Sequence, residues 1–201
     1  MMRSPNDVEQ LLAKAAEAAT EGRPRDARKL VRRALALDPD HPRAQLHWAI
    51  ELIDQPQQAR YHLRRAAELG HGDPAIEYQV ACVLLELGEI RAALLLARRA
   101  RGHVEDDDFR FLPGFMNLTG RLADATGYDE VAERALALAF ELEPEMAWHG
   151  RTLAQFLHRQ GRAADALRVT RAALEYAPDD PSLVALRDRL AARRPAGAPS
   201  A

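Results

Sequence analysis

The sequence predicts an all-α fold in which short helix hairpins repeat along the chain to form an α-solenoid. Three observations predict it. Of the residues, 47% are hydrophobic but only 5% are aromatic, and Ala, Leu and Arg, which favour helices, dominate. Small residues recur at a spacing near 34 residues. Glycine and proline fall at regular places between the apolar stretches, where helices must end.

The spacing of the alanines gives the length of the repeat. In the second helix of each expected hairpin an early alanine recurs at spacings of 32, 34, 39 and 34 residues, and a second alanine follows seven residues later. The first helices carry a small residue in matching phase. The three sets are Ala27, Ala59, Ala93, Ala132 and Ala166; Ala34, Ala66, Ala100, Ala139 and Ala173; and Ala15, Ala49, Ala81, Gly120 and Ala154. Because antiparallel helices approach closely only where side chains are small, five helix-turn-helix repeats are predicted.

The turn residues agree with this phase. Pro24 and Pro56 open second helices, where the missing N–H has no cost. The stretch "ALALDPDHP" at 34–42 reads as a boundary at which Asp40 or His41 caps the next helix, because similar stretches recur around Pro144 and Pro178 without the histidine. Glycines that can end a helix in a left-handed conformation lie inside four of the hairpins. They are Gly22, Gly88, Gly127 and Gly161.

The repeated alanines and the turn residues together predict how the chain is divided into repeats and terminal segments. After the last repeat, Asp180 should cap a helix over 181–194 whose apolar stripe is Leu183, Leu186 and Leu190. That helix would cover the exposed end of the array. The expected parts are a flexible 1–7, five repeats within 8–178 (about 8–41, 42–73, 74–112, 113–146 and 147–180), the capping helix 181–194 and a disordered tail 195–201.

Residues 8–178 resemble the tetratricopeptide repeat family, through the phase of the alanines and through Pro39, Pro144 and Pro178. Two departures are visible. The large aromatic of the family's first helix survives only as Trp48, and repeats two and three end without the proline. The resemblance implies a right-handed solenoid whose first helices line a concave groove, and a role as a non-catalytic scaffold for protein binding.

Composition limits the classes of partner and compartment. The formal net charge of −2 gives no general attraction to nucleic acid or to an anionic membrane. The single cysteine, Cys82, forbids an internal disulfide. No signal-like apolar stretch opens the chain, and its longest apolar runs are far too short to span a membrane. A cytoplasmic protein is expected.

No catalytic or metal-binding pattern stands out. None of the seven histidines pairs with another one helical turn away. The acidic run Asp106, Asp107 and Asp108 lacks the alternating ligands and the glycine of a calcium loop. Phosphate loops and nucleophile elbows are absent from the sequence. We therefore expect no enzyme activity, no cofactor and no metal site.

The groove that the resemblance implies would be apolar at one end and mainly basic at the other. Such a groove suits a peptide, tail or helix with hydrophobic anchors followed by acidic residues. The alternative is that neighbouring helices cover the apolar positions and that the arginines are simply solvated. The candidate residues are Leu46, Ile50, Tyr78, Cys82 and Leu85, then Asn117, Arg121, Arg151, Gln155, His158 and Arg159.

A second candidate surface consists of arginine pairs that recur at one phase of the second helices. The pairs are Arg32 with Arg33, Arg64 with Arg65, and Arg98 with Arg99. They predict a convex ridge that would suit phosphates or acidic proteins, so an accessory protein for RNA or DNA is one alternative function. A solvated helix face is the simpler interpretation, and binding to nucleic acid is not favoured. A second alternative is self-assembly into a homo-oligomer, in which the apolar end of the groove takes up a helix of another copy.

Overall fold

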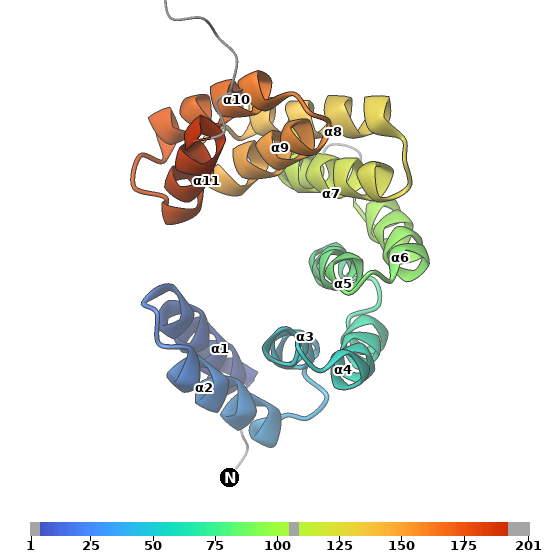
Figure 1. The fold of residues 1–201 in the computed structure, drawn as a ribbon. Helices are drawn as coiled ribbons and strands as arrows, with labels where there is room; N and C mark the ends of the chain where they lie inside the picture. The colour runs from blue at the N-terminus through green and yellow to red at the C-terminus, as the bar shows by residue number, and fades with distance from the viewer. Residues whose placement is uncertain (1–4, 105–108, 193–201) are drawn as a thin grey trace, which may run out of the picture. The chain divides into compact units, whose positions relative to one another are not determined.

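A computed structural model describes residues 5–104 and 109–192 of the chain (Figure 1). In these residues every regular element is helical. The helices are α1 (Pro5–Thr20), α2 (Pro24–Leu37), α3 (Pro42–Glu51), α4 (Pro56–Leu69), α5 (Pro74–Glu86), α6 (Ile90–Gly102), the 3-10 helix η1 (Phe109–Phe111), α7 (Leu112–Ala125), α8 (Asp129–Leu142), α9 (Ala147–Arg159), α10 (Ala163–Tyr176) and α11 (Pro181–Ala192). The chain divides into two compact units, 1–105 and 106–201, which we call the N-terminal and C-terminal units.

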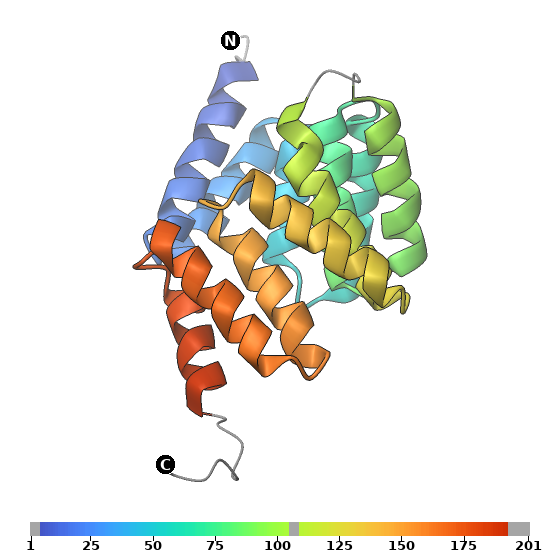
Figure 2. The same cartoon turned by 90° about the horizontal axis from the view of Figure 1, so that it is seen from above.

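The N-terminal unit consists of three helix hairpins. Helices α1 and α2, α3 and α4, and α5 and α6 form the hairpins. In addition, α2 packs on α3 and α4 packs on α5. The first helices contact one another as well, α1 with α3 and α3 with α5. Two views of the ribbon show the hairpins following one another in chain order (Figures 1 and 2). This is the nearest-neighbour packing of a helical repeat array.

The C-terminal unit repeats the same plan. Helices α7 and α8 form one hairpin and α9 and α10 the next, while α8 packs on α9 and α7 contacts α9. The final helix α11 packs against α9 and α10. Its apolar side chains Leu183, Leu186 and Leu190 are buried, so α11 covers the last hairpin as the sequence predicted.

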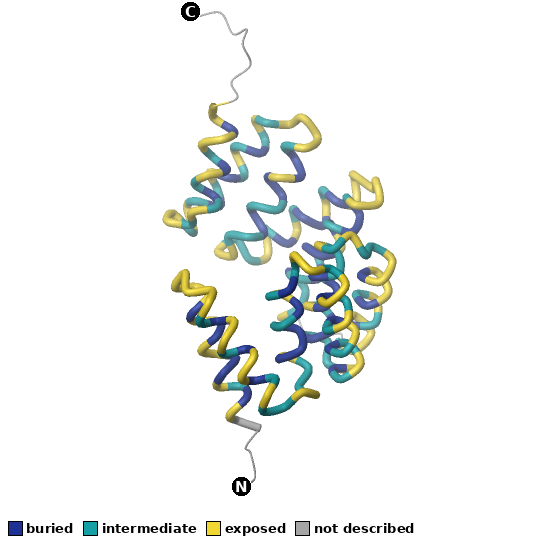
Figure 3. Tube along the Cα trace, turned by 60° about the horizontal axis from the view of Figure 1, so that its bottom comes forward, coloured by how far each residue is buried: buried dark blue, intermediate teal, exposed yellow. Residues whose placement is uncertain are grey.

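The small residues lie where the helices meet. All of the repeated alanines are buried, most of them completely, and Figure 3 shows buried positions recurring along the helices. Gly120 on α7 allows a close approach to α8. A Cβ atom built on Gly120 would lie 2.5 Å from Cγ of Leu136 on α8, nearer than real atoms come. The recurring small residues therefore mark the positions at which the paired helices touch.

The helix ends also follow the prediction. Gly22, Gly88, Gly127 and Gly161 have φ values from 71° to 80°, the left-handed region that a side chain disfavours. Nδ1 of His41 accepts a hydrogen bond from the Ala44 N–H at the start of α3. The all-α fold of repeated hairpins with a capping helix is confirmed.

Two details differ from the expected organisation or lie outside the described residues. Helix α1 already begins at Pro5, so residues 5–7 are helical rather than flexible, and Asp7 places an acidic side chain in the first turn, which the helix dipole favours. Residues 1–4, the acidic run 106–108 and the predicted tail 195–201 lie outside the described residues. Among the helices that are described, none combines the length and apolar character needed to cross a bilayer.

Candidate functional site

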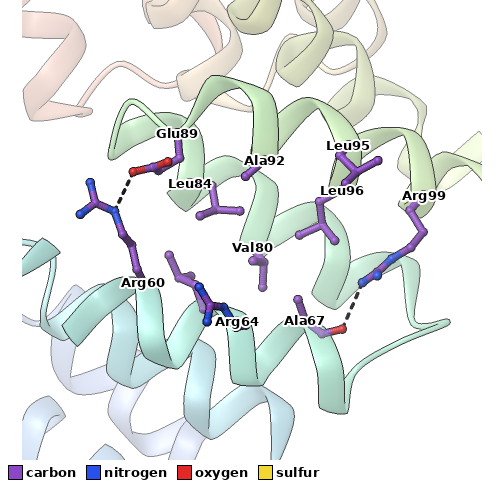
Figure 4. Close-up of a pocket in the computed structure, with 11 residues that line it drawn as sticks. Arg60, Arg64, Ala67, Val80, Leu84, Glu89, Ala92, Leu95, Leu96 and Arg99 are labelled. Atoms are coloured by element: carbon purple, nitrogen blue, oxygen red, sulfur yellow. Dashed lines mark hydrogen bonds and ion pairs between the residues drawn. The ribbon is translucent and has the colours of Figure 1, made fainter. Parts of the chain in front are cut away.

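The N-terminal unit contains a cavity of about 270 Å³ between the second helices α4 and α6, with the first helix α5 beneath them (Figure 4). Helix α4 forms one wall and α6 the other. Most of the lining is apolar, so burial of an apolar group from water would be the main source of binding energy here. The apolar lining consists of Leu63, Ala67, Val80, Leu84, Ala92, Leu95 and Leu96.

Charged side chains stand at the two ends of this cavity (Figure 4). At one end, Nε of Arg60 lies 2.7 Å from Oε1 of Glu89 in an ion pair. At the other end, Arg99 donates a hydrogen bond from Nη2 to the Ala67 carbonyl oxygen on α4, at 3.1 Å. These contacts fix both ends of the cavity and occupy the guanidinium groups that make them.

Two lining residues are left available to a ligand. Arg64 on α4 is exposed and forms no ion pair within residues 5–104 and 109–192. Leu95 on α6 is 72% exposed, a high value for a leucine on a helix that already buries another face. An unpaired guanidinium therefore borders the same apolar cavity as a solvent-exposed leucine.

The arginine pairs of the predicted ridge divide into two kinds. The first member of each pair, Arg32, Arg64 or Arg98, is exposed. Among the second members, Arg33 is exposed, but Arg65 forms an ion pair with Asp40, which precedes α3. Arg99 likewise turns inward, as described next. The surface therefore offers fewer unpaired arginines than the sequence suggested, because two of the six link one hairpin to the preceding part of the chain.

Arg99 forms an ion pair with the buried carboxylate of Glu77, whose burial the sequence did not indicate. Glu77, in the first turn of α5, has no exposed surface, and its Oε1 lies 2.7 Å from Nε of Arg99 and accepts a hydrogen bond from the Gly72 N–H at 3.2 Å. Its Oε2 lies 2.9 Å from Nδ1 of His103, directly after α6. The His71 ring lies near that of His103, with ring centroids 5.5 Å apart.

These residues could hold a metal ion. Ligand atoms of His71, Glu77 and His103 all lie within 4.8 Å of one another. The sequence pattern that indicates a metal site on a helix is a pair of histidines one turn apart. That pattern cannot reveal a group assembled from a loop, a helix start and a helix end.

The groove residues of the N-terminal unit are only partly on the surface. Leu46 on α3 is 1% exposed, because α3 has helix neighbours on both sides, so this residue belongs to the core and its assignment to the groove lining is corrected. Ile50 on α3 is 46% exposed. Tyr78, Cys82 and Leu85 on α5 are half-buried.

In the C-terminal unit three of the predicted groove residues form contacts with residues outside the predicted set. Asn117 on α7 is fully buried and its Nδ2 lies 3.1 Å from Nδ1 of His149 on α9, so it too is a core residue, and its assignment to the lining is corrected. Arg151 donates to the Ser182 hydroxyl at 2.9 Å, and Arg159 forms an ion pair with Asp124. The remaining candidates are half-buried or exposed. They are Arg121 and His158, both half-buried, and Gln155, which is exposed.

Burial in this core disfavours the charged form of the His149 imidazole. Burial lowers its pKa from 6.5, although Nε2 lies 3.3 Å from the Glu143 carboxylate, which acts in the opposite direction. The Asn117–His149–Glu143 group links α7 to the start of α9 through its side chains. Its position in the interior indicates a structural role.

Comparison with solved structures places the fold among tetratricopeptide repeat proteins. A tetratricopeptide repeat protein of Thermus thermophilus, TTC0263, is 21% identical over 92% of this chain and 97% of its own, with a TM-score of 0.76. PilW, described as a widely conserved type IV pilus biogenesis factor, is 15% identical over 96% of both chains, with a TM-score of 0.67. YrrB, described as a tetratricopeptide repeat protein with an unusual peptide-binding site, is 18% identical over 89% of this chain and 90% of its own, with a TM-score of 0.51.

No family model matches the sequence, and no curated protein is significantly similar to it. At these sequence identities the structural likeness establishes the fold alone. The function must be argued from the residues of the site.

Proposed function

From this tetratricopeptide-type fold, we propose that the chain is a non-catalytic protein-interaction scaffold that binds a segment of a partner protein in the cavity between α4 and α6. One observation carries the proposal: the apolar cavity is bordered by an exposed leucine, Leu95, and by an arginine without an ionic partner among the described residues, Arg64. Exposed apolar side chains around a pocket are typical of binding surfaces. YrrB, which shares the fold, is itself described as having a peptide-binding site, which supports this class of function.

The chemistry of the cavity defines the partner segment. A volume of about 270 Å³ is small for a cofactor site and suits one or two side chains, so the segment should insert an apolar anchor such as leucine or phenylalanine. Arg60 and Arg99 already have partners, which leaves Arg64 to set the charge preference. A carboxylate near the anchor would pair with its guanidinium. The expected segment is therefore apolar with an acidic neighbour.

The groove on the first helices remains a prediction. Ile50, 46% exposed on α3, favours a contribution from that face in the N-terminal unit. It and the half-buried residues of α5 would extend a partner's contact area beyond the cavity. In the C-terminal unit, Gln155 is the exposed member of the predicted set that has no side-chain contact among the described residues with which a ligand would compete.

The alternatives drawn from the sequence rank lower. Binding of nucleic acid would use the arginine ridge, but Arg65 and Arg99 are engaged in ion pairs. Self-assembly would need the apolar end of the groove, where Leu46 is buried. A cytoplasmic location stays a prediction.

Selection of displayed peptides tests the proposal. Peptides selected on the untagged chain should combine an apolar anchor with one or more acidic residues. We expect Arg64→Glu to weaken their binding by about tenfold or more, since it replaces attraction by repulsion. Arg171→Glu is the matched control, because Arg171 holds the corresponding exposed position on α10. Equal affinity for both variants would refute the assignment of the cavity.

A further inference from the structure

We propose that His71, Glu77 and His103 form a zinc-binding site at the open end of the third hairpin, where α5 begins and α6 ends. The three residues come from different elements. His71 lies in the connection between α4 and α5, Glu77 in the first turn of α5, and His103 at the end of α6. Their ligand atoms nevertheless lie within 4.8 Å of one another.

Glu77 is oriented as a ligand by its surroundings. Its Oε1 accepts a hydrogen bond from the Gly72 N–H and forms the ion pair with Arg99, whose own Nη2 is held by the Ala67 carbonyl oxygen. These contacts fix the carboxylate and leave Oε2 directed at His103, 2.9 Å away. Outer contacts that fix a carboxylate in this way orient the ligands of zinc sites.

The donor set indicates which metal would bind. Two imidazole nitrogens and one carboxylate oxygen form a set that zinc uses, with water in the fourth position. Calcium and magnesium prefer oxygen ligands throughout. Ligands around a tetrahedral zinc stand about 3.4 Å apart, as follows from bonds near 2.1 Å. His71 is exposed and free to rotate toward that spacing, while Glu77 stays buried.

Charge limits the affinity of the site. Arg99 already balances the Glu77 carboxylate, so an arriving cation would not find an uncompensated negative charge. We therefore expect zinc to bind less tightly than in a structural site built from cysteine ligands. Once bound, zinc would connect the end of α6 to the connection before α5 and would raise the unfolding temperature by preferential binding to the folded state.

Competition with a chromophoric zinc chelator tests the site on the full untagged chain, previously treated with a chelator. The wild type should bind one equivalent of zinc and show a higher unfolding temperature with zinc than without it. The variant His71→Ala/His103→Ala should lose more than about tenfold in affinity, because two of three ligands are removed. The control His47→Ala/His158→Ala also removes two histidines but leaves the cluster intact.

The variants are expected to fold, since both imidazoles of the cluster lie at the surface, and circular dichroism checks this directly. Loss of binding in the cluster variant with retention in the control supports the site. Equal zinc affinity in the cluster variant and the wild type, or the absence of zinc binding by the wild type, overturns it. Neither result bears on peptide binding by the cavity, which is measured without zinc.

Discussion

Nε of Arg99 on α6 lies 2.7 Å from Oε1 of Glu77, a carboxylate with no exposed surface in the first turn of α5. The same guanidinium donates to the carbonyl oxygen of Ala67 on α4. Arg99 thus connects three helices, and it forms one end of the proposed binding cavity. An arginine that looks from the sequence like part of a surface ridge is, in the fold, mainly a structural residue.

The Arg99→Met variant should lose stability. The substitution leaves the buried Glu77 carboxylate without its main cationic partner, and we expect a loss of about 2 kcal/mol in the free energy of unfolding, below the value for a completely buried pair because Arg99 is partly exposed. Urea unfolding measures the change. Arg98→Met, next to it but exposed, is the control and should change stability by less than about 0.5 kcal/mol. Similar losses in both variants would show that the buried pair is unimportant.

Gly120→Ala should be destabilising although alanine favours helices. The new Cβ would lie 2.5 Å from Cγ of Leu136, and overpacking of this kind costs about 1–3 kcal/mol. Gly102→Ala is the matched control, because a Cβ there meets nothing within 4 Å. Chemical denaturation should show no loss for the control. A stabilised Gly120→Ala variant would mean that α7 and α8 are less closely packed than described.

Stability should fall as the pH is lowered below about 6.5. Burial lowers the pKa of His149 in the folded state, and burial also lowers the pKa of His47 and of His62. Below the unfolded pKa of 6.5 the unfolded chain therefore binds more protons than the folded chain, which favours unfolding as the pH falls toward the folded pKa values. Denaturant titrations from pH 7.5 down to about pH 5 measure this slope.

The contribution of His149 to that slope can be separated from the others. The His149→Gln variant should be less stable than the wild type at pH 7.5, since it disturbs a buried group, but its stability should depend less on pH. The slope should not vanish, because His47 and His62 remain. A variant with an unchanged slope would show that His149 does not titrate differently in the two states.

The capping helix α11 should depend on Asp180. Oδ1 of Asp180 accepts hydrogen bonds from the Ser182 hydroxyl and from the N–H groups of Leu183 and Ser182, the last two at 2.9 and 3.0 Å. These bonds, the one from the Ser182 hydroxyl most of all, lower the pKa of the carboxyl group. We expect Asp180→Ala to cost about 1 kcal/mol and to increase amide exchange in α11. The neighbouring Asp179→Ala, at an exposed position, should have neither effect. Unchanged exchange in α11 would contradict the role of this cap.

The repeat and its turns could be predicted because they depend on local chemistry. An alanine such as Ala66 is required where two helices touch, and Gly88 is required where a helix ends in a left-handed conformation. The alanine returns at every repeat, and the glycine inside four of the five hairpins. The sequence therefore carries them as a period that does not depend on knowledge of the neighbours.

The candidate site could not be predicted in the same way. Helical periodicity placed Leu46 and Asn117 on one face with surface residues, but both are covered by neighbouring helices. Glu77 gives no sign in the sequence of being buried, since its partners Arg99 and His103 lie more than 20 residues away. The cavity depends on the sizes of side chains from three helices. Such sites arise from tertiary packing rather than from the pattern along one element.

Photo-crosslinking of a selected peptide tests the central claim most directly. The apolar anchor of the peptide is replaced by a benzophenone side chain, and the crosslinked residue of the protein is identified by mass spectrometry. The proposal predicts crosslinks to the cavity lining, at Leu63, Leu84 or Leu96, and their loss with the Arg64→Glu variant. Crosslinks confined to α3 around Ile50 or to the C-terminal unit would contradict the proposal that the cavity between α4 and α6 is the binding site.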